Sequence, residues 1–577
     1  MQITGAQLFV KALKEEQVDT LFAYPGGQAI DLFNALYGEK DIEVILPRHE
    51  QALVHAADGY ARSTGKVGVC LVTSGPGATN LVTGIATANY DSVPLVCFTG
   101  QVATSLIGND AFQEVDIVGI TRSICKYAVT VRNRDELATV IKKAFYIART
   151  GKPGVVVVDL PKDIQQQKGS DEYPEQVEIR GYKPKTSVHI GQIKKAVDLL
   201  NKAKKPVFLI GGGVNIAHAN QEMTKLAELT GIPVITTIMG KGAIPTDHEL
   251  YVGNIGIHGS FAANSAISNC DVLFSIGTRF NDRITGKIEE FASNATIIHI
   301  DIDSASISRN IAVDIPIVAD AKNAIEALLK KASPLKIDGW REQIIEWKKN
   351  YPITMHQDGL TPQRIIQSIN QVFDDAVITT DVGQNQLWTT QYLEIGENKQ
   401  LLTSGGLGTM GYGFPAGIGA KLGNPEKDVV VVSGDGGMQM NIQEMATAVV
   451  YELPMTICIL NNGYLGNVRQ WQEMFFDKRY SCTCLRYRRS CESACSTPGA
   501  ECPVYTPDFV KLAESYGAKG IRVTKPEEIE GALLEAKNNK KVPTIIEFII
   551  EREANVMPMV PPGNSLSDMI LESGDTE

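Results

Sequence analysis

The sequence predicts an α/β protein with three doubly wound parallel-sheet domains, and three features support this prediction. Continuous apolar runs such as Val429–Val432 are typical of strands that are buried on both faces of a parallel sheet. Glycine-rich turns and helix-periodic segments follow several of these runs, which is the pattern of βαβ units. Two polar stretches, at residues 165–190 and 331–362, divide the chain into parts of domain size.

The expected domains cover residues 1–165, 190–335 and 360–550, and residues 551–577 form a C-terminal tail. In the first domain we expect, in order, the strand Val44–Leu46, the helix Glu50–Thr64, the strand Val67–Val72, the helix Ala78–Ala88 and the strand Leu95–Phe98. The expected strands of the other two domains are Val207–Ile210, Val234–Thr237, Val272–Ile276, Ile297–Ile300, Val429–Val432 and Thr456–Leu460.

Composition restricts the classes of protein to consider. The chain is 44 % hydrophobic and 21 % charged, as ordinary soluble proteins are, and no apolar run is long enough to predict a transmembrane helix. The first residues lead directly into an amphipathic helix, so we expect no signal peptide and a cytoplasmic location. The net charge is −11 and no extended basic arm is present, which argues against a nucleic-acid partner.

Two strand ends in the third domain predict a metal site. Asp435 follows the valine strand within Gly434–Gly437, and Asn462 follows the next expected strand, so both should lie at the carboxyl edge of one parallel sheet. Carboxylate and amide oxygens suit Mg²⁺, and the glycines and a helix N-terminus suit a diphosphate. Asn441 and Glu444 predict a capping pair for the helix between the two strands. An ordinary glycine-rich βα turn is the alternative.

The Gly-Asp-Gly turn and Asn461-Asn462, with 27 positions from Asp435 to Asn462, resemble the thiamine diphosphate motif. The resemblance implies that Mg²⁺ is held by Asp435, Asn462 and the backbone carbonyl of Tyr464, and that Gly434, Gly436, Gly437 and Met438 bind the cofactor. Val72–Gly77 repeats the strand-and-glycine pattern of Val432–Gly437 but lacks the Asp, so only the third domain is expected to hold the metal.

Glu50 opens a helix, where an acidic residue ordinarily just complements the helix dipole. Its segment, from Arg48 to Arg62, also resembles the glutamate motif of thiamine diphosphate enzymes. The resemblance implies that Glu50 hydrogen-bonds the aminopyrimidine ring and assists its activation. Glu50 is therefore the predicted catalytic residue.

The similarity extends to the acetohydroxyacid (acetolactate) synthase family, to its large, FAD-containing biosynthetic subunits. Ala23–Gly27 resembles the turn over the cofactor, Ala111–Glu114 the segment whose glutamine approaches the reacting carbon, and Gly405–Gly411 the loop beneath the thiazolium. The implied roles are catalytic for Gly27 and Gln113, an acceptor carbonyl for Gly408, and for Met410 an apolar wedge, although simple core filling is the alternative for Met410.

Two further segments distinguish this family from other thiamine diphosphate enzymes. Arg279–Lys287 resembles its RFDDR stretch, with Asn281 in place of an Asp, and implies that Arg283 binds the carboxylate of the second 2-ketoacid. Gln470–Gln472 matches the tryptophan segment that favours 2-ketobutyrate over pyruvate as acceptor, so Trp471 is the predicted specificity residue, with a core tryptophan as the alternative.

A structural FAD is implied for the middle domain. Gly211-Gly212-Gly213 follows a strand but is not a G-x-G-x-x-G fingerprint, so alone it is weak. Together with Arg279, and with Asp301 at the end of a later strand, it resembles the FAD site of the family. Val556–Gly563 matches the family tail that folds over the active site.

The cysteines are unevenly distributed. Cys70, Cys97, Cys125, Cys270 and Cys458 lie mostly in apolar segments and are expected in the core. The other five lie between Cys482 and Cys502, in an insertion of roughly twenty residues relative to the family, expected near the cover of the active site. A solvated loop, a metal or iron–sulfur site and redox-responsive thiols are the three alternatives for this insertion.

The resemblance implies thiamine diphosphate-dependent decarboxylation of pyruvate and transfer of the two-carbon unit to pyruvate or 2-ketobutyrate, the first common step of branched-chain amino-acid biosynthesis. It also implies a homodimer or homotetramer and a small regulatory subunit. A flavin-using enzyme of the pyruvate oxidase kind is the alternative, and Glu50 argues against a glyoxylate carboligase. A non-enzymatic regulator would be expected to lack Glu50, Asp435 or Asn462.

Overall fold

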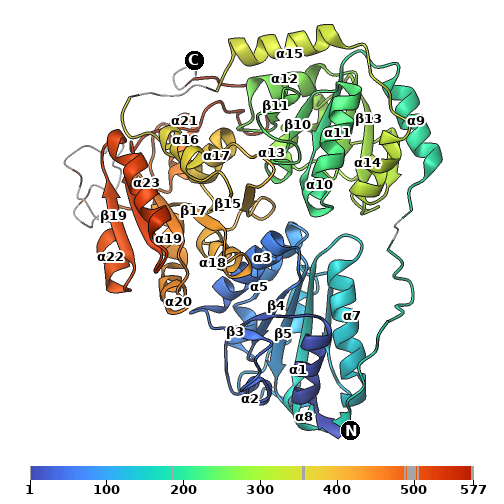
Figure 1. Cartoon of the computed structure of the whole chain (residues 1–577), viewed down its shortest axis with the longest axis vertical. Coiled ribbons are helices and arrows are strands. Elements are labelled where there is room, and N and C mark those ends of the chain that lie inside the picture. The colour runs from blue at the N-terminus through green and yellow to red at the C-terminus, as the bar shows by residue number, and fades with distance from the viewer. Residues whose placement is uncertain are drawn as a thin grey trace.

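The computed structural model describes residues 2–184, 187–353, 358–486 and 506–572, and the single positions 489, 491 and 502. Within these residues the chain forms three six-stranded parallel sheets with flanking helices, which confirms the predicted fold class. Figure 1 shows the N-terminal unit at the bottom in blue, the middle unit in green and the C-terminal unit in orange and red.

The N-terminal and C-terminal sheets have the same strand order. The N-terminal sheet runs β3 (Glu43–Ile45), β2 (Thr20–Ala23), β4 (Gly68–Val72), β5 (Leu95–Gln101), β7 (Val155–Pro161), β6 (Tyr127–Thr130). The C-terminal sheet runs β16 (Gln400–Thr403), β15 (Ala376–Thr380), β17 (Asp428–Gly434), β18 (Thr456–Asn461), β20 (Thr544–Ile549), β19 (Lys519–Val523). In both sheets the strands of the repeated motif, β4 and β17, hold the same position, so the repeat expected from the sequence is real.

The middle sheet has a different order. It runs β11 (Tyr251–Asn254), β10 (Val234–Thr236), β9 (Pro206–Ile210), β12 (Val272–Ile276), β13 (Thr296–Asp301), β14 (Ile315–Val318). This is the order of dinucleotide-binding folds, in which the first strand lies beside the fourth and ligands bind where the order reverses.

Helices flank each sheet (Figure 1). Those of the N-terminal unit are α1 (Gly5–Glu15), α2 (Ile30–Leu36), α3 (Glu50–Thr64), α4 (Pro76–Thr79), α5 (Val82–Tyr90), α6 (Ile117–Thr121), α7 (Leu137–Arg149) and α8 (Lys162–Gln166). Those of the middle unit are α9 (Ile190–Leu200), α10 (Gly212–Ile216), α11 (Asn220–Thr230), α12 (Phe261–Asn269), α13 (Asp282–Thr285), α14 (Ala321–Leu329) and α15 (Asp338–Asn350). Those of the C-terminal unit are α16 (Pro362–Val372), α17 (Gln384–Tyr392), α18 (Gly413–Gly423), α19 (Asp435–Met440), α20 (Met445–Val450), α21 (Gly466–Phe475), α22 (Phe509–Ser515) and α23 (Ile529–Asn538). Among the described residues, no helix combines the length and the apolar character that crossing a membrane requires.

The N-terminal and C-terminal units contact each other through α3 and α18. A Cβ on Gly59 would lie 2.0 Å from the Ala416 carbonyl oxygen, and a Cβ on Gly419 would lie 1.7 Å from that of Ala56. The two helix backbones therefore approach each other at a distance that only glycine permits.

A short antiparallel strand pair closes the N-terminal unit. Strand β1 (Gln2–Thr4) pairs with β8 (Lys168–Ser170), and the buried Arg134 donates to the carbonyls of Ile3, Gln167 and Ser170. The N-terminus and the exit of this unit therefore lie side by side.

Four expectations about local structure are corrected. The helix expected at Ala78–Ala88 is broken into α4 and α5, and Asn441 caps no helix, because its amide donates to the Gly411 carbonyl while Glu444 accepts from the Arg48 amide. The polar stretch at 165–190 contains β8, and the one at 331–362 contains α15, whose Trp340 and Ile344 are buried. These helices and strands are fixed by contacts with distant segments, which a local pattern does not contain.

The core cysteines are close to expectation. Cys70, Cys97, Cys270 and Cys458 are buried, and Cys125 is partly buried.

Candidate active site

The predicted metal ligands lie at one edge of the C-terminal sheet. Asp435 begins α19 directly after β17, and Asn462 follows β18, the neighbouring parallel strand. The Asn462 side-chain oxygen accepts the Tyr464 amide at 3.0 Å, which folds the chain so that Tyr464 stays beside Asn462. The structure thus brings the three residues together.

The carboxylate of Asp435 is suited to a cation. It is buried, and its Oδ2 accepts no hydrogen bond. Burial raises the pKa of Asp435 to about 7, because a charged carboxylate is poorly solvated there. A buried carboxylate, an amide oxygen and a backbone carbonyl form the hard oxygen set that Mg²⁺ prefers, so these residues fit the ion.

The glycines beside Asp435 are tightly packed. A Cβ on Gly437 would lie 2.4 Å from Asp381 Oδ1, and a Cβ on Gly436 would lie 2.8 Å from the Leu465 side chain. Gly434 ends β17, and Met438 is buried in α19. The turn therefore has no room for side chains at Gly436 and Gly437, so that backbone alone forms it there, as a diphosphate site requires.

Asp381 and Gln384 belong to the same sheet edge, although the sequence analysis did not select them. Asp381 follows β15 and accepts the amides of Gly411 and Gly413 at 3.0 and 3.1 Å. Gln384 accepts the Asn462 side-chain amide at 3.2 Å. The available signal was their place directly after a strand of this sheet, next to Gly383.

The loop that carries Gly408 and Met410 lies over the glycine turn. The Met410 Cε lies 3.7 Å from a Cβ built on Gly436, and Gly408 is exposed with a φ of 72°, a conformation that favours glycine. Met410 is partly buried.

Glu50 lies at the corresponding edge of the N-terminal sheet. Its Oε2 accepts the Asn80 side-chain amide at 2.9 Å, and its Oε1 lies 3.6 Å from a Cβ built on Gly77. Gln113 packs on the same turn, since a Cβ on Gly75 would lie 3.0 Å from the Gln113 Cβ. Glu50 and Gln113, distant in sequence, therefore meet at one glycine turn.

Gly27 lies on a neighbouring turn. A Cβ on Gly26 would lie 2.5 Å from the Thr73 side chain, whereas Gly27 is exposed and its carbonyl accepts Lys162 Nζ at 2.8 Å.

The two predicted substrate residues meet. The Arg283 guanidinium, on α13 of the middle unit, lies over the Trp471 ring of α21, with its carbon 5.8 Å from the ring centre. Trp471 Nε1 is buried without a hydrogen-bond partner. The tail lies beside them: the Val556 carbonyl accepts Gln470 Nε2 at 3.0 Å, and the Val560 amide donates to the Ile257 carbonyl at 2.8 Å.

A cleft of about 1390 Å³ lies against the middle unit. Its lining includes all the residues predicted to bind FAD, namely Gly211, Gly212, Gly213, Arg279 and Asp301. Common ligand pockets have volumes of about 300–1,000 Å³. This cleft is larger, which suits a ligand as large as a dinucleotide.

The cleft also has the polarity that a dinucleotide needs. A Cβ on Gly211 would lie 2.1 Å from the Gly277 carbonyl, so backbone forms this wall. Thr278 Oγ1 and Asn281 Oδ1 are buried without hydrogen-bond partners, and burial raises the pKa of Asp301 to about 6. Lys241, which the sequence analysis did not select, also lines the cleft, and burial lowers its pKa to about 7. These residues fit FAD.

The cysteine-rich insertion starts beside the predicted metal site. The Leu465 amide donates to the Thr483 carbonyl and the Leu485 amide to the Gly463 carbonyl, both at 2.9 Å. Within the described part of the chain, no three His, Cys, Asp or Glu side chains form a group that could hold a metal ion. Cys495, one of the five cysteines considered, lies outside the described residues.

Comparison with protein families matches all three units. The N-terminal TPP binding domain, the central domain and the C-terminal TPP binding domain of thiamine pyrophosphate enzymes match residues 3–120, 193–328 and 381–548. TPP is thiamine pyrophosphate, another name for thiamine diphosphate.

Individual relatives are similar over nearly the whole chain. A probable acetolactate synthase large subunit of Methanocaldococcus jannaschii is 47 % identical, covering 98 % of this chain and 95 % of its own length. A second, from Methanococcus aeolicus, is 46 % identical with the same coverage, and the isozyme 3 large subunit of Escherichia coli is 44 % identical, covering 99 % and 98 %. These relatives do not favour the pyruvate oxidase alternative. The chain belongs to the thiamine diphosphate-dependent enzymes and, within them, to the acetolactate synthase large subunits.

Proposed function

We propose that this chain decarboxylates pyruvate and joins the two-carbon unit to a second 2-ketoacid, pyruvate or 2-ketobutyrate, in the first common step of branched-chain amino-acid biosynthesis. The observation that carries this proposal is the contact between Arg283 and Trp471. A cation and a large aromatic ring side by side suit a 2-ketoacid, because the cation pairs with the carboxylate and the ring limits the alkyl group.

Mg²⁺ is proposed at Asp435, Asn462 and the Tyr464 carbonyl, with the diphosphate against Gly434, Gly436, Gly437 and Met438. The unsatisfied Oδ2 of Asp435 and the packed glycines support this assignment. Bound thiamine diphosphate supplies the electron sink for the decarboxylation. The protein contributes orientation and electrostatics.

Glu50 is the proposed proton-holding residue. The Asn80 amide donates to one of its oxygens, which fixes the carboxylate at the N-terminus of α3. The other oxygen would share a proton with the aminopyrimidine of a bound cofactor. Gln113 and Gly27, on the neighbouring turns, are proposed to contact the reacting part of the substrate. The Gly408 carbonyl and the Met410 side chain are proposed to hold the cofactor in its bent shape.

FAD is proposed in the cleft of the middle unit, against Gly211, Gly212, Gly213, Arg279 and Asp301, with a structural role. The volume of the cleft and its unsatisfied Thr278 and Asn281 oxygens support this assignment.

A homodimer or homotetramer with the active site between two chains is proposed from the family resemblance. A separate small regulatory subunit is proposed because the relatives are named large subunits. The proposed domains are residues 1–165, 190–335 and 360–550, with the tail at 551–577 over the active site. The proposed location is the cytoplasm.

An anaerobic assay tests the function. The chain is incubated with pyruvate, thiamine diphosphate, Mg²⁺ and FAD, and acetolactate, CO₂ and flavin absorbance are followed, with and without 2-ketobutyrate. We expect acetolactate without net flavin reduction and a preference for 2-ketobutyrate. Flavin reduction with acetate as product would instead identify the oxidase chemistry.

A matched pair of variants assigns the role of Glu50. Glu50→Gln keeps the shape of the side chain but cannot hold the proton, so kcat should fall about 10²- to 10⁴-fold. Glu43→Gln, on the exposed edge of β3 in the same unit, is the control and should keep the wild-type rate.

A further inference from the structure

Three units of the chain meet at Gly405 and Gly406, just after β16. A Cβ on Gly405 would lie 2.3 Å from Met239 Sδ of the middle unit. A Cβ on Gly406 would lie 2.6 Å from Asp91 Oδ1 of the N-terminal unit and 3.0 Å from Arg279 Nη2 of the middle unit. The C-terminal unit is therefore enclosed here by side chains from both other units.

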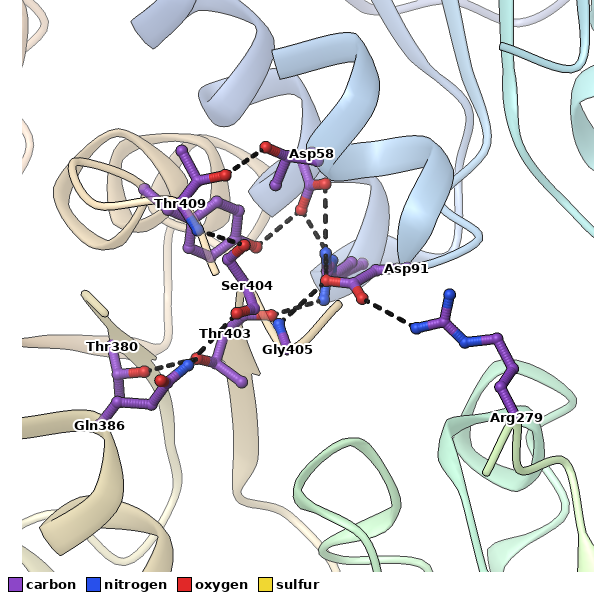
Figure 2. Close-up of polar contacts among 12 residues, drawn as sticks. Asp58, Asp91, Arg279, Thr380, Gln386, Thr403, Ser404, Gly405 and Thr409 are labelled. Atoms are coloured by element: carbon purple, nitrogen blue, oxygen red, sulfur yellow. Dashed lines mark hydrogen bonds and ion pairs between the residues drawn. The ribbon is translucent and has the colours of Figure 1, made fainter. Parts of the chain in front are cut away.

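The Asp91 carboxylate lies at the centre of this junction (Figure 2). Its Oδ2 accepts the Gly405 amide at 3.1 Å and Arg62 Nη2 at 3.0 Å. Its Oδ1 is buried, accepts no hydrogen bond, and faces Arg279 Nη2 at 4.0 Å. The Asp91 carboxylate thus contacts the C-terminal unit through one oxygen and faces the middle unit with the other.

Among the described residues, Asp58 forms hydrogen bonds and ion pairs with Arg62 and Tyr412, and with neither Gly405 nor Arg279. Asp58 pairs with Arg62 at 2.7 Å and accepts the Tyr412 hydroxyl at 2.6 Å, and Arg62 donates to the Thr403 carbonyl at 3.0 Å. Asp58 is as buried as Asp91 and belongs to the same network (Figure 2), which makes it a matched control.

Asp91 contacts two segments, and each of them belongs to a proposed cofactor site. Gly405 begins the loop that carries Gly408 and Met410, and that loop is held further on by Thr409, whose hydroxyl lies 2.7 Å from that of Thr87. On the other side, Asp91, Arg279 and Gly405 all line the large cleft of the middle unit.

We propose that Asp91 is a positioning residue that couples occupancy of the cleft by a flavin dinucleotide to the conformation of the Gly405–Met410 loop, and so to the affinity for thiamine diphosphate. This inference rests on the cofactor sites given under the proposed function. The Arg279 side chain is 36 % exposed, its Nη2 lies 4.0 Å from Asp91 Oδ1, and its guanidinium carbon lies 5.9 Å from the centre of the Tyr90 ring. These contacts are long, so the side chain has room to adjust.

The sign of the coupling follows from the chemistry of Arg279. A guanidinium has five N–H donors and can face two anions at once. A dinucleotide phosphate in the cleft would fix Arg279 between itself and Asp91 Oδ1. Fixing Asp91 also fixes its hydrogen bond from the Gly405 amide, which orders the loop. The coupling is therefore positive, and linkage requires it to be reciprocal.

The test uses the full-length chain freed of cofactors, at constant Mg²⁺. Thiamine diphosphate is titrated by quenching of intrinsic tryptophan fluorescence, with and without saturating FAD, and FAD binding is measured separately by flavin fluorescence. In the wild type, FAD should lower the Kd for thiamine diphosphate at least about fivefold, the lower end of common coupling strengths. Thiamine diphosphate should lower the Kd for FAD by the same factor.

Three variants distinguish a specific loss of coupling between the two cofactors from a general loss of folding. In Asp91→Asn the ratio of the two Kd values should fall below about twofold, whereas Asp58→Asn should keep the wild-type ratio even though it also removes a buried charge. Arg279→Met changes a partly exposed position. This variant should lose the coupling even at FAD concentrations that saturate its FAD site. Circular dichroism and gel filtration check that each variant is folded.

The outcomes are distinct. Tight FAD binding with no effect on thiamine diphosphate, or a wild-type ratio in both Asp91→Asn and Arg279→Met, overturns the coupling and leaves the proposed FAD site standing. Loss of coupling in Asp58→Asn to the same extent as in Asp91→Asn also overturns it, because the effect would then be one of general stability. No FAD binding by the wild type overturns the FAD assignment and the coupling together.

Discussion

At the scale of single residues, the fold buries Asp435 where its charged carboxylate is unfavourable. An unpaired charge buried in protein costs several kcal/mol, and the carboxyl group meets this cost by keeping a proton up to about pH 7. The proposed divalent cation would remove this cost, since it would replace the proton and pair with Oδ2, which accepts no hydrogen bond.

Asp435→Asn should therefore weaken Mg²⁺ binding by more than about 100-fold, the upper end of losses caused by residues that only support a metal ligand. The amide keeps the shape but loses the charge. Mg²⁺ titration of the chain with thiamine diphosphate, followed by calorimetry, measures the change. Asp428→Asn, at the start of the same strand and paired with Lys540 at the surface, should bind Mg²⁺ as the wild type does. Equal affinity in both variants would refute the metal assignment.

Trp471 should set the choice of acceptor. Trp471→Leu enlarges the space beside Arg283, so the preference for 2-ketobutyrate over pyruvate should fall by about 10- to 200-fold, the value of one methylene in an apolar site. Competition between the two acceptors, with both products quantified, gives the ratio. Trp347→Leu, on α15 of the middle unit, should leave the ratio unchanged. An unaltered ratio in Trp471→Leu would make Trp471 a packing residue only.

At the scale of elements, the crossing of α3 and α18 holds Glu50 in place. Glu50 is the first residue of α3, and this helix is fixed against the C-terminal unit by the close approach at Gly59 and Gly419. The position of the carboxylate that we propose to be catalytic therefore depends on two glycines that have no chemistry of their own.

Gly419→Ala should lower the thermal midpoint, because its Cβ would overlap the Ala56 carbonyl and overpacking of this kind costs about 1–3 kcal/mol. Gly531→Ala is the matched control, since it lies in the exposed face of α23 with no atom within 4 Å of the new Cβ. There alanine should stabilise by about 0.5–1 kcal/mol through its higher helix propensity. A Gly419→Ala protein as stable as the wild type would mean that the two helices separate without cost. Calorimetric scans of the two variants provide the comparison.

Much of the secondary structure could be predicted from the sequence, because apolar runs and glycine turns are local signals. The helix Glu50–Thr64 and the strand Val272–Ile276 have the predicted bounds. The break between α4 and α5 and the strand β8 could not be predicted, since both depend on contacts with distant segments.

Some residues of the candidate site could be predicted from the sequence and others could not. Asp435 and Asn462 were predictable because strand order brings neighbouring strand ends together, and Arg283 and Trp471 because of the family resemblance. Asp91 and Asp381 carry no motif. Their importance comes from which backbone amides they accept, and that appears only when the chain is folded.

At the scale of the whole molecule, each of the three sheets has a buried aspartate near the carboxyl end of a strand. Burial raises the pKa of Asp159, Asp301 and Asp381 to about 6 in each case. A raised pKa means that the folded protein binds more protons than the unfolded chain between about pH 4 and 6. The contribution of each group to stability is therefore complete below pH 4 and is lost as pH rises through 6.

Asp159→Asn tests this contribution at a residue that is assigned to none of the proposed cofactor sites. Asn does not titrate, so the stability of the variant relative to the wild type should rise by about 3 kcal/mol between pH 4 and pH 7, two pKa units at 1.36 kcal/mol each. Thermal midpoints of both proteins measured at each pH provide the comparison. The substitution also changes the hydrogen bonds that Asp159 accepts from Thr99, Gln101 and Thr130, but this adds an offset that does not vary with pH. A difference that does not change with pH would show that Asp159 is ionised normally.

Because β1 pairs with β8, the first strand and the last strand of the N-terminal unit lie side by side. A break in the backbone within residues 171–184 would leave both strand partners on the same fragment, and every strand of the other two sheets on its complement. The α3–α18 crossing and the Arg62–Asp91 network join the two pieces without any help from the peptide chain. The protein is thus divisible: two polypeptides expressed separately, one ending and the other beginning in this segment, should assemble into a working whole.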